Sequence, residues 1–302
     1  MNNGEKSMDM KISAVFLIIG LLTGVAVGYV AAPRTGATTG TELTGTIVVK
    51  GSDTLLIVAQ QWAEEFISLH PKVNIQVAGG GTGTGFTALR DKTTDIADAS
   101  REIKTSEVES CKAAGVNPVE WTVGLDGISI VVHPNNPVNS LSTTQLEMIY
   151  NGTYTNWSEV GGSNAPIVTY GRQSTSGTYD FFREHVLHNR DYRADNRELA
   201  GNAEIVQSVQ GDANGIGYVG VAYTKQGVDV KILGISSSST TIYQPTIANI
   251  KSGAYPIARK LYIYTDSEQS DLLEQYVAFI LGPQGQEILE EVGYISTIKL
   301  EK

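Results

Sequence analysis

The sequence GRQSTSGT, residues Gly171–Thr178, carries more information than any other part of the chain. Arg172 places a fixed positive charge four residues before a Ser-Gly-Thr turn, and the residues that follow, Tyr179–Phe182, are typical of a helix. Backbone N–H groups in the first turn of a helix have no intrahelical partner, and the positive end of the helix dipole lies there. Such a turn holds oxyanions without a metal ion. The pattern therefore predicts a strand, Ile167–Tyr170, that leads into an anion-binding turn.

A similar turn, GSDTL at Gly51–Leu55, lies near the start of the chain. It joins a short apolar segment typical of a strand, Ile47–Lys50, to Leu55–Leu69, where apolar residues recur at the spacing of one helix face. Serine, aspartate and threonine at the start of a helix are also ordinary N-caps. This turn alone therefore fits both a structural cap and an anion site.

The third cluster is glycine-rich, GGGTGTG at Gly79–Gly85, and joins a predicted strand, Val73–Val77, to a predicted helix, Phe86–Arg90. Its five glycines let a backbone approach a ligand closely. Gly83–Ala88 also fits the loose G-x-G-x-x-A form of a dinucleotide site, but the acidic residue expected about 20 positions later is not clearly placed. No lysine follows the glycines as a P-loop requires, so a small anion remains the favoured ligand.

A second arginine, Arg101, follows Ser100 at the end of a predicted strand, Asp95–Ala99. Open α/β sheets bind ligands at the carboxyl ends of their strands, which makes this arginine a candidate. An exposed, solvated side chain is the alternative interpretation.

The alternation of strands and helices indicates a doubly wound α/β sheet. Further strands are predicted at Ile128–Val132, Gly215–Val219 and Leu261–Tyr264. Further helices are predicted from Ser106 with Glu109 as a capping box, from Ser142 with Gln145, over Ser267–Leu281 and over Pro283–Val292.

Length and composition narrow the function. The 302 residues suggest about two domains, and the net charge of −10 makes a nucleic-acid partner improbable. The single cysteine, Cys111, excludes an internal disulfide and a cysteine-rich metal site, and we interpret it as a buried inert thiol. His185 and His188 lack the H-E-x-x-H order of a zinc site and are interpreted as surface residues. No cofactor and no metal are expected.

The N-terminus is predicted to direct export. Residues 1–11 contain Lys6 and Lys11, as the leading region of a secretory signal or a membrane anchor would. Residues 12–32 are uncharged and mostly apolar, and the segment is long enough to span a bilayer. Pro33 follows the best small-residue cleavage site, so an uncleaved signal anchor is favoured over a cleaved signal peptide. Residues 33–44 are interpreted as a flexible linker. The expected location is the extracytoplasmic face of the membrane, with a secreted protein as the alternative if the segment is cleaved.

Seven motifs occur in an order that resembles the phosphate-binding proteins of ABC phosphate importers. They are Gly51–Thr54, Gly79–Gly85, Thr94–Arg101, Asn156–Gly162, Arg172–Thr178, Gly211–Tyr218 and Tyr255–Tyr262. The resemblance implies an α/β fold of the type 2 periplasmic-binding-protein kind, in which two lobes, each a mixed sheet flanked by helices, enclose a ligand cleft. We expect residues 45–126 plus 230–302 in one lobe and 127–229 in the other, with crossings near 125–132 and 220–235.

The family's ligands carry over residue by residue. The resemblance assigns a hydroxyl to Thr54, a backbone N–H to Leu55 and a hydroxyl to Thr82. It assigns the family's arginine and Ser-Gly-Thr turn to Arg172, Ser176, Gly177 and Thr178. Some members carry an aspartate at the position of Ser100 that accepts the proton of hydrogen phosphate, whereas Ser100-Arg101 resembles a second subgroup. Asp53 and Asp126 are alternative acceptors. The candidate phosphate-binding residues are Ser52, Asp53, Thr54, Leu55, Thr82, Gly83, Ser100, Arg101, Arg172, Ser176, Gly177 and Thr178.

The resemblance implies a monomeric solute-binding protein, not an enzyme, that captures inorganic phosphate and delivers it to an ABC permease in the membrane. Three alternatives stay open from the residues alone. They are a binding protein for another tetrahedral oxyanion such as sulfate, molybdate or tungstate, a surface-anchored phosphate sensor, and an exported phosphohydrolase.

Overall fold

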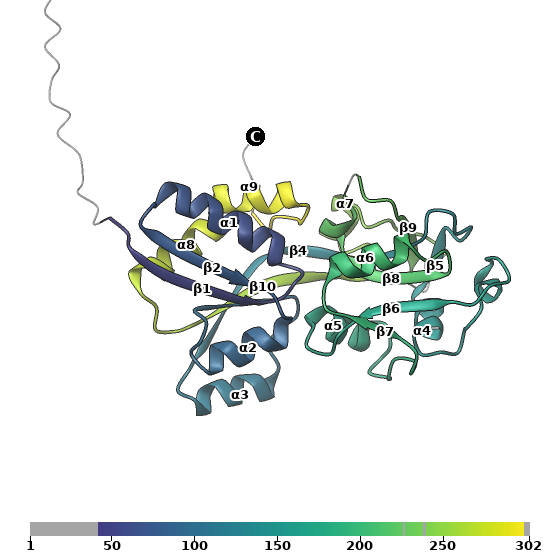
Figure 1. The fold of residues 1–302 in the computed structure, drawn as a ribbon, viewed down its shortest axis with the longest axis horizontal. Coiled ribbons are helices and arrows are strands. Elements are labelled where there is room, and N and C mark those ends of the chain that lie inside the picture. Colours follow the sequence, from purple (N-terminus) through teal and green to yellow (C-terminus); the bar gives the residue numbers. More distant parts are fainter. Residues whose placement is uncertain (1–41, 226, 238–239, 299–302) are drawn as a thin grey trace, which may run out of the picture. The chain divides into compact units, whose positions relative to one another are not determined.

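The computed structural model describes residues 42–225, 227–237 and 240–298, and its elements form two lobes (Figure 1). We define the first lobe as the described residues before 127 and after 257. Its strands are β1 (Gly45–Gly51), β2 (Val73–Ala78), β3 (Ile96–Ala99), β10 (Ala258–Asp266) and the first part of β4 (Pro118–Val132). Its helices are α1 (Leu56–Leu69), α2 (Thr82–Arg90), α3 (Thr105–Ala113), α8 (Asp271–Leu281) and α9 (Pro283–Val292).

The second lobe comprises the described residues 127–257. Its strands are the rest of β4, β5 (Ser140–Ser142), β6 (Val168–Arg172), β7 (Arg197–Leu199), β8 (Gly215–Gly220) and β9 (Lys231–Ser236). Its helices are α4 (Thr143–Tyr150), α5 (Gly177–His185), α6 (Asn202–Gln210), α7 (Ile247–Lys251) and the short 3₁₀ turns η1 (Trp157–Val160) and η2 (Val221–Thr224).

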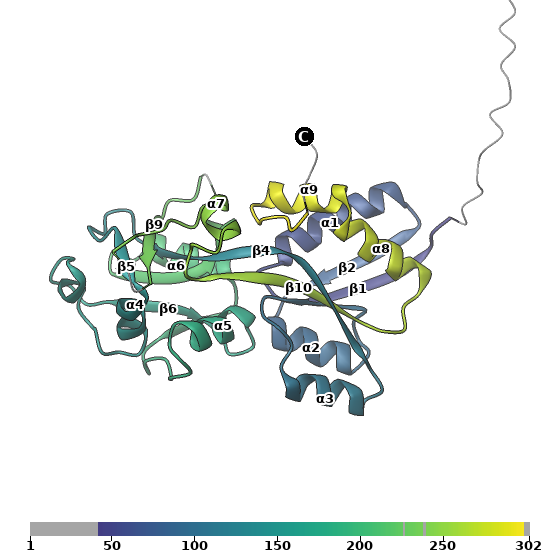
Figure 2. The same cartoon turned by 180° about the vertical axis from the view of Figure 1, so that it is seen from behind.

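Strands β4 and β10 connect the two lobes. The strands follow the order β2-β1-β3-β10-β4-β8-β6-β7, with β9 also beside β4 and β5 beside β9. β1 lies parallel to β2 and β3, whereas β10 runs antiparallel to both β3 and β4. β4 pairs with β10 up to Gly127 and with β8 from Ile128 onward, so one continuous strand serves both lobes (Figures 1 and 2).

Alternating strand residues divide the first-lobe core into two layers. Ile96 faces the cluster under α1, α8 and α9, whereas Ala97 and Ala99 face the cluster under α2 and α3. Leu261 and Tyr262 on β10 alternate in the same way. Because neighbouring strand side chains point to opposite faces, this sheet needs helices on both sides, and Figures 1 and 2 show them there.

The second lobe repeats this arrangement. Ile128, Ile130 and Val132 of β4 pack with α4, α5 and α7, whereas Val131 packs with α6. Tyr150 is fully buried in the first of these clusters, and its hydroxyl donates to the carbonyls of Tyr170 and Ile216. Burying a phenol with its hydroxyl satisfied gives a large apolar contribution without an orphaned polar group.

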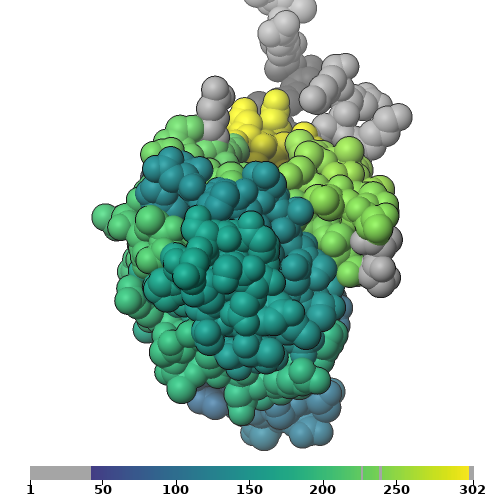
Figure 3. All heavy atoms as spheres, turned by 90° about the vertical axis from the view of Figure 1, so that its right-hand side faces the viewer, coloured from purple at the N-terminus to yellow at the C-terminus, as the bar shows by residue number. Residues whose placement is uncertain are grey.

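The segment from β9 to α7 lies in the second lobe, although the sequence analysis assigned residues 230–302 to the first. β9 pairs with β4 at Ile130–Val132, and Leu233, Ile235 and Ile250 are buried in the second-lobe core. Figure 3, which views the second lobe from its end, shows yellow-green residues of this segment beside the teal ones. Near the predicted crossing at 220–235, Ala222 packs on the first-lobe core, but the chain then returns to the second lobe with β9 and re-enters the first lobe with β10, near residue 258.

Most predicted elements form, with shifted boundaries. The capping box of Ser142 and Gln145 is confirmed, since each side chain accepts the other's backbone N–H at 3.0 and 2.8 Å. The box predicted at Ser106 and Glu109 is wrong: α3 begins at Thr105, and Glu107 accepts the N–H of Lys104 at 2.8 Å. Cys111 is buried, as predicted, and burial raises the pKa of its thiol.

The predicted export segment, residues 12–32, lies outside the described residues. Within the part of the chain that the structure describes, no helix is both long enough and apolar enough to cross a membrane.

One ionisable group in the first-lobe core generates a prediction. Asp98 on β3 is buried, and burial raises the pKa of its carboxyl to about 8. The folded protein therefore retains a proton that the unfolded chain releases near pH 4, so the free energy of unfolding falls as the pH rises from 4 to 8. We expect Asp98→Asn to be more stable than the unsubstituted protein at pH 8 and to remove up to about 1.4 kcal/mol per pH unit of this slope. Urea denaturation at several pH values measures both, and identical slopes in the two proteins would contradict the prediction.

Candidate functional site

Three turns that are distant in the sequence meet between the lobes. They are the β1–α1 turn around Thr54, the β2–α2 turn around Thr82 and the β6–α5 turn around Ser176. The Gly83 N–H donates to the carbonyl of Thr175 at 2.9 Å, which ties the second turn to the third. Gly81, with φ of 93°, lies so close that an added Cβ would be 2.5 Å from the same carbonyl. The structure thus brings together the three helix N-termini that the sequence singled out.

Buried hydroxyls from these turns bond to one another. Ser52 Oγ donates to Ser100 Oγ at 2.9 Å, and the hydroxyls of Thr54 and Thr178 are 3.0 Å apart. Thr82 Oγ1 accepts the Ser100 N–H at 3.1 Å. We call Ser52, Thr54, Thr82, Ser100, Ser176 and Thr178 the hydroxyl cluster, and all six are buried.

Ser176 is also the N-cap residue of α5. Its hydroxyl accepts the N–H groups of Thr178 and Tyr179 at 3.2 and 3.4 Å. An N-cap serine satisfies donors that the helix itself leaves unpaired, which fixes the direction of the first turn.

Arg172 is a buried cation beside the first of the three turns. Its side chain is 1% exposed, and Nη2 donates to Asp53 Oδ2 at 2.6 Å and to the Ala200 carbonyl at 2.7 Å. Among the described residues, Nε and Nη1 of Arg172 are buried polar atoms without a hydrogen-bond partner. Burial lowers the pKa of the guanidinium, and Asp53 opposes that shift. A buried guanidinium with two free donors is suited to an anion.

Arg172 is also held from its backbone. Its N–H donates to the hydroxyl of Tyr218 at 3.1 Å, and that hydroxyl lies 3.0 Å from the hydroxyl of Tyr192. Tyr218 stacks on Phe182 with ring centroids 4.2 Å apart, which joins β8 to α5 beneath the turn.

Arg101 is committed to carboxylates. It bonds both oxygens of Glu107 at 2.7 and 2.8 Å and donates from Nε to Asp180 at 2.8 Å. Burial lowers the pKa of Arg101, but the two carboxylates outweigh it and the net shift is upward. The side chain is neither exposed nor solvated, and its ion pairs link the start of α3 to α5 of the other lobe.

Two backbone N–H groups in the candidate set also donate to carbonyls of the protein. Leu55 N–H bonds to the Ser52 carbonyl at 3.0 Å, and Gly83 N–H bonds to Thr175. The Leu55 side chain is buried in the first-lobe core.

Sequence reasoning missed Arg259, whose guanidinium reaches the hydroxyl cluster. It pairs with the fully buried Asp126 at 2.7 Å and also donates to the hydroxyls of Thr54 and Thr178. Burial raises the pKa of Asp126, and Arg259 opposes that shift. A signal was present: Arg259 shares a strand face with Leu261 and Ile263, so alternation places it inward.

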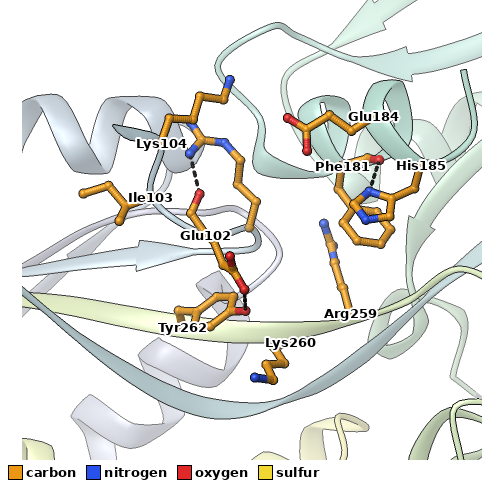
Figure 4. Close-up of a pocket in the computed structure, with 10 residues that line it drawn as sticks. Glu102, Ile103, Lys104, Phe181, Glu184, His185, Arg259, Lys260 and Tyr262 are labelled. Carbon is orange, nitrogen blue, oxygen red and sulfur yellow. Dashed lines mark hydrogen bonds between the residues drawn. The ribbon is translucent and has the colours of Figure 1, made fainter. Parts of the chain in front are cut away.

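A cavity of about 420 Å³ opens beside Arg259 (Figure 4). The loop after β3, the middle of α5 and strand β10 surround it. Its lining residues are Arg101, Glu102, Ile103, Lys104, Phe181, Glu184, His185, Arg259, Lys260 and Tyr262. None of the six hydroxyls lines it, and of the candidate phosphate-binding residues only Arg101 does.

The described residues contain no group of three or more histidine, cysteine, aspartate or glutamate side chains that could hold a metal. His185 and His188 are exposed, as predicted.

The comparisons with known proteins agree with this geometry. A family model described as a PBP superfamily domain matches residues 36–284. The phosphate-binding protein PstS of Pseudomonas aeruginosa is 32% identical over 270 residues, which cover 84% of this chain and 83% of that protein. The chain therefore belongs to the PBP superfamily, in the family of the phosphate-binding proteins.

Solved structures give the same result. A putative phosphate ABC transporter substrate-binding protein with bound phosphate from Clostridium perfringens is 29% identical, with a TM-score of 0.77, and covers 84% of this chain and 100% of its own. A possible phosphate-binding protein from Planctomyces limnophilus is 33% identical, with a TM-score of 0.60, and covers 85% of this chain and 94% of its own. The two-lobed type 2 fold predicted from the motifs is thereby confirmed.

Close contact between the second and third turns gives a prediction for Gly177. A Cβ there would lie 2.7 Å from Ser100 Oγ and closer still to Thr82 Oγ1. Gly177→Ala must therefore separate the turns or break the bond between Thr82 and Ser100, and we expect it to lower the free energy of unfolding by about 1–3 kcal/mol. Urea denaturation measures the change.

Gly211→Ala is the matched control, because an added Cβ would make only ordinary contacts, at 3.7 and 3.8 Å. We expect its effect to stay within about 0.5 kcal/mol. Equal stabilities of the two variants would show that the turns are not closely packed.

Proposed function

We propose that this chain is an extracytoplasmic solute-binding protein that captures inorganic phosphate and delivers it to an ABC importer. One observation carries the proposal: five buried hydroxyls from three helix N-termini, together with that of Ser100 after β3, gather near a buried arginine that retains two unpartnered donors. The relatives' names, which include phosphate-binding and phosphate ABC transporter proteins, support the same ligand. In this proposal the phosphate ligands are the candidate residues of the sequence analysis, although Arg101 contributes through its ion pairs.

Phosphate binding would exchange hydroxyl–hydroxyl bonds for hydroxyl–phosphate bonds. In the structure, one hydrogen bond joins the hydroxyls of Thr54 and Thr178. Two hydrogen bonds donated to an anion are more favourable than this single bond between neutral groups. Arg172 would supply a charged donor, Nε or Nη1, to an oxygen of the anion, because neither nitrogen has a partner among the described residues. Hydrogen bonds to a charged group contribute about 1.5–3 kcal/mol each, so a few of them compensate for dehydrating the anion.

Discrimination between phosphate and sulfate would depend on an acceptor for the phosphate proton. Asp53 and Asp126, the two carboxylates considered for this role, are each bonded to an arginine. We therefore assign the acceptor role to a neutral hydroxyl of the cluster, with Ser100 as the candidate. A neutral mismatch costs about 1–3 kcal/mol, which corresponds to roughly tenfold to hundredfold weaker sulfate binding.

Release and delivery would follow from movement of the lobes. Thr54 and Thr82 belong to the first lobe, Thr178 to the second, and β4 with β10 connects them. We propose that the lobes close on phosphate about these strands and that closure reports occupancy to the permease. A monomer held at the membrane by residues 12–32, or secreted if they are cleaved, suits this role.

Loss of the buried guanidinium tests the central ligand. Arg172→Ala removes both unpartnered donors, and we expect phosphate affinity to fall at least about tenfold, as the loss of one charged hydrogen bond implies. Isothermal calorimetry measures the affinity. Arg183→Ala is the control, because Arg183 on α5 pairs with the exposed Asp191, and it should leave the affinity within about twofold. An unchanged affinity for Arg172→Ala would remove this residue from the site.

Titration of the purified protein with phosphate, arsenate and sulfate tests the function itself. We expect phosphate and arsenate to compete for one site per chain, because they share shape and protonation, and sulfate to bind at least about tenfold more weakly. Tight binding of sulfate, molybdate or tungstate without phosphate binding would favour another oxyanion as the ligand. Hydrolysis of a generic phosphate ester by the purified protein would instead support the phosphohydrolase alternative.

A further inference from the structure

Arg259 contacts both lobes from the strand that joins them. Nη1 donates to the Ser100 carbonyl at 3.0 Å, and Nη2 donates to Thr54 Oγ1 at 3.3 Å and Thr178 Oγ1 at 3.0 Å. Figure 4 shows the guanidinium rising from β10 toward the space between the lobes. One side chain thus reaches two segments of the first lobe and helix α5 of the second.

Asp126 fixes the orientation of this guanidinium. The two residues are opposite each other in the β4–β10 register, and Asp126 Oδ2 accepts from Nε at 3.0 Å and from Nη2 at 2.7 Å. The other oxygen, Oδ1, accepts the Val221 N–H at 3.0 Å. Because both charges are buried, neither is tolerated without the other, and the pair is anchored to backbone on both sides.

The contacts of Nη2 determine which way the hydroxyl protons point. A hydroxyl has one proton and two lone pairs, whereas a guanidinium only donates. Nη2 gives one of its two hydrogens to Asp126 and directs the other at lone pairs of Thr54 and Thr178, so the protons of these two hydroxyls must point away from Nη2. Arg259 therefore biases two ambivalent hydroxyls toward acting as donors.

We propose that Arg259, held by Asp126, is a positioning residue for anion capture: it orients the hydroxyls of Thr54 and Thr178 as donors and joins them across the two lobes. It acts through these hydroxyls and is not itself a ligand. This inference rests on the proposed function, because it requires an anion that receives the hydroxyl protons. It also assigns to the strand pair between the lobes a role in ligand selection, since only an acceptor ligand benefits from protons directed in this way.

A mutant cycle tests the inference. Arg259→Lys keeps the charge but loses the planar fork that reaches Asp126, Ser100 and both hydroxyls at once. It is made in the unsubstituted protein and in a Thr54→Val/Thr178→Val background, where the hydroxyls are replaced by methyl groups of similar size. Phosphate dissociation constants are measured by equilibrium dialysis with radiolabelled phosphate, and thermal melting without phosphate verifies folding.

We expect Arg259→Lys to weaken phosphate binding at least about tenfold in the unsubstituted protein and less than about threefold in the valine background, because residues that act through one another are not additive. The same factor in both backgrounds, or no change in the first, would overturn the inference. If Arg259→Lys does not fold, Asp126→Asn replaces it in the cycle, since it frees the guanidinium without removing it, and the same two expectations apply.

Arg193→Lys is the matched control. Arg193 bonds Asp195 at 2.6 Å and the Ile167 carbonyl at 3.4 Å, and neither partner belongs to the hydroxyl cluster. It should change the phosphate affinity less than about twofold in either background. An unsubstituted protein that does not bind phosphate would overturn the proposed function and this inference together, whereas normal binding with an additive cycle would overturn the inference alone.

Discussion

A guanidinium removed from water imposes the arrangement of the interior. Arg172 loses its hydration on burial, and a single carboxylate contact through Nη2 does not replace what all its donors had in solvent. Nε and Nη1 remain without a partner among the described residues, and in the function proposed above an anion would supply the missing acceptor. The turns around Thr54, Thr82 and Ser176 surround this region with hydroxyls, and Tyr218 fixes the backbone beneath it. In the proposed function, the free-energy cost of burying the Arg172 charge and the affinity for the anion are therefore linked.

The second buried arginine has a different relation to its surroundings. Arg259 is neutralised by Asp126, and each nitrogen of its guanidinium has a hydrogen-bond partner within the protein. Arg259 therefore holds neighbouring groups in place, whereas Arg172 retains two nitrogens without a partner among the described residues. Both depend on strands that end or cross between the lobes, which is where side chains from the two halves can converge without a loop between them.

Local patterns in the sequence were sufficient for the three turns, because capping, glycine content and strand-to-helix order are all read within about ten residues. They were insufficient for contacts between distant segments. The partners Asp126 and Arg259 are 133 residues apart, and the sequence around either residue does not indicate that the other is its partner. Arg101 shows the same limit: assigning the helix start to Ser106 hid Glu107 as its partner. The β9–α7 segment was misplaced because its assignment depends on pairing with β4, which no local signal reports.

The position of β10 has a consequence for how the chain acquires its structure. β10 lies between β3 and β4 in the sheet. These two strands therefore cannot be joined until residues 258–266 have been synthesised. The first half of the chain consequently cannot complete its sheet, and folding waits on contacts of high sequence separation, which are slow to form. Such a delay would suit the proposed extracytoplasmic location, which requires the chain to cross a membrane before it folds.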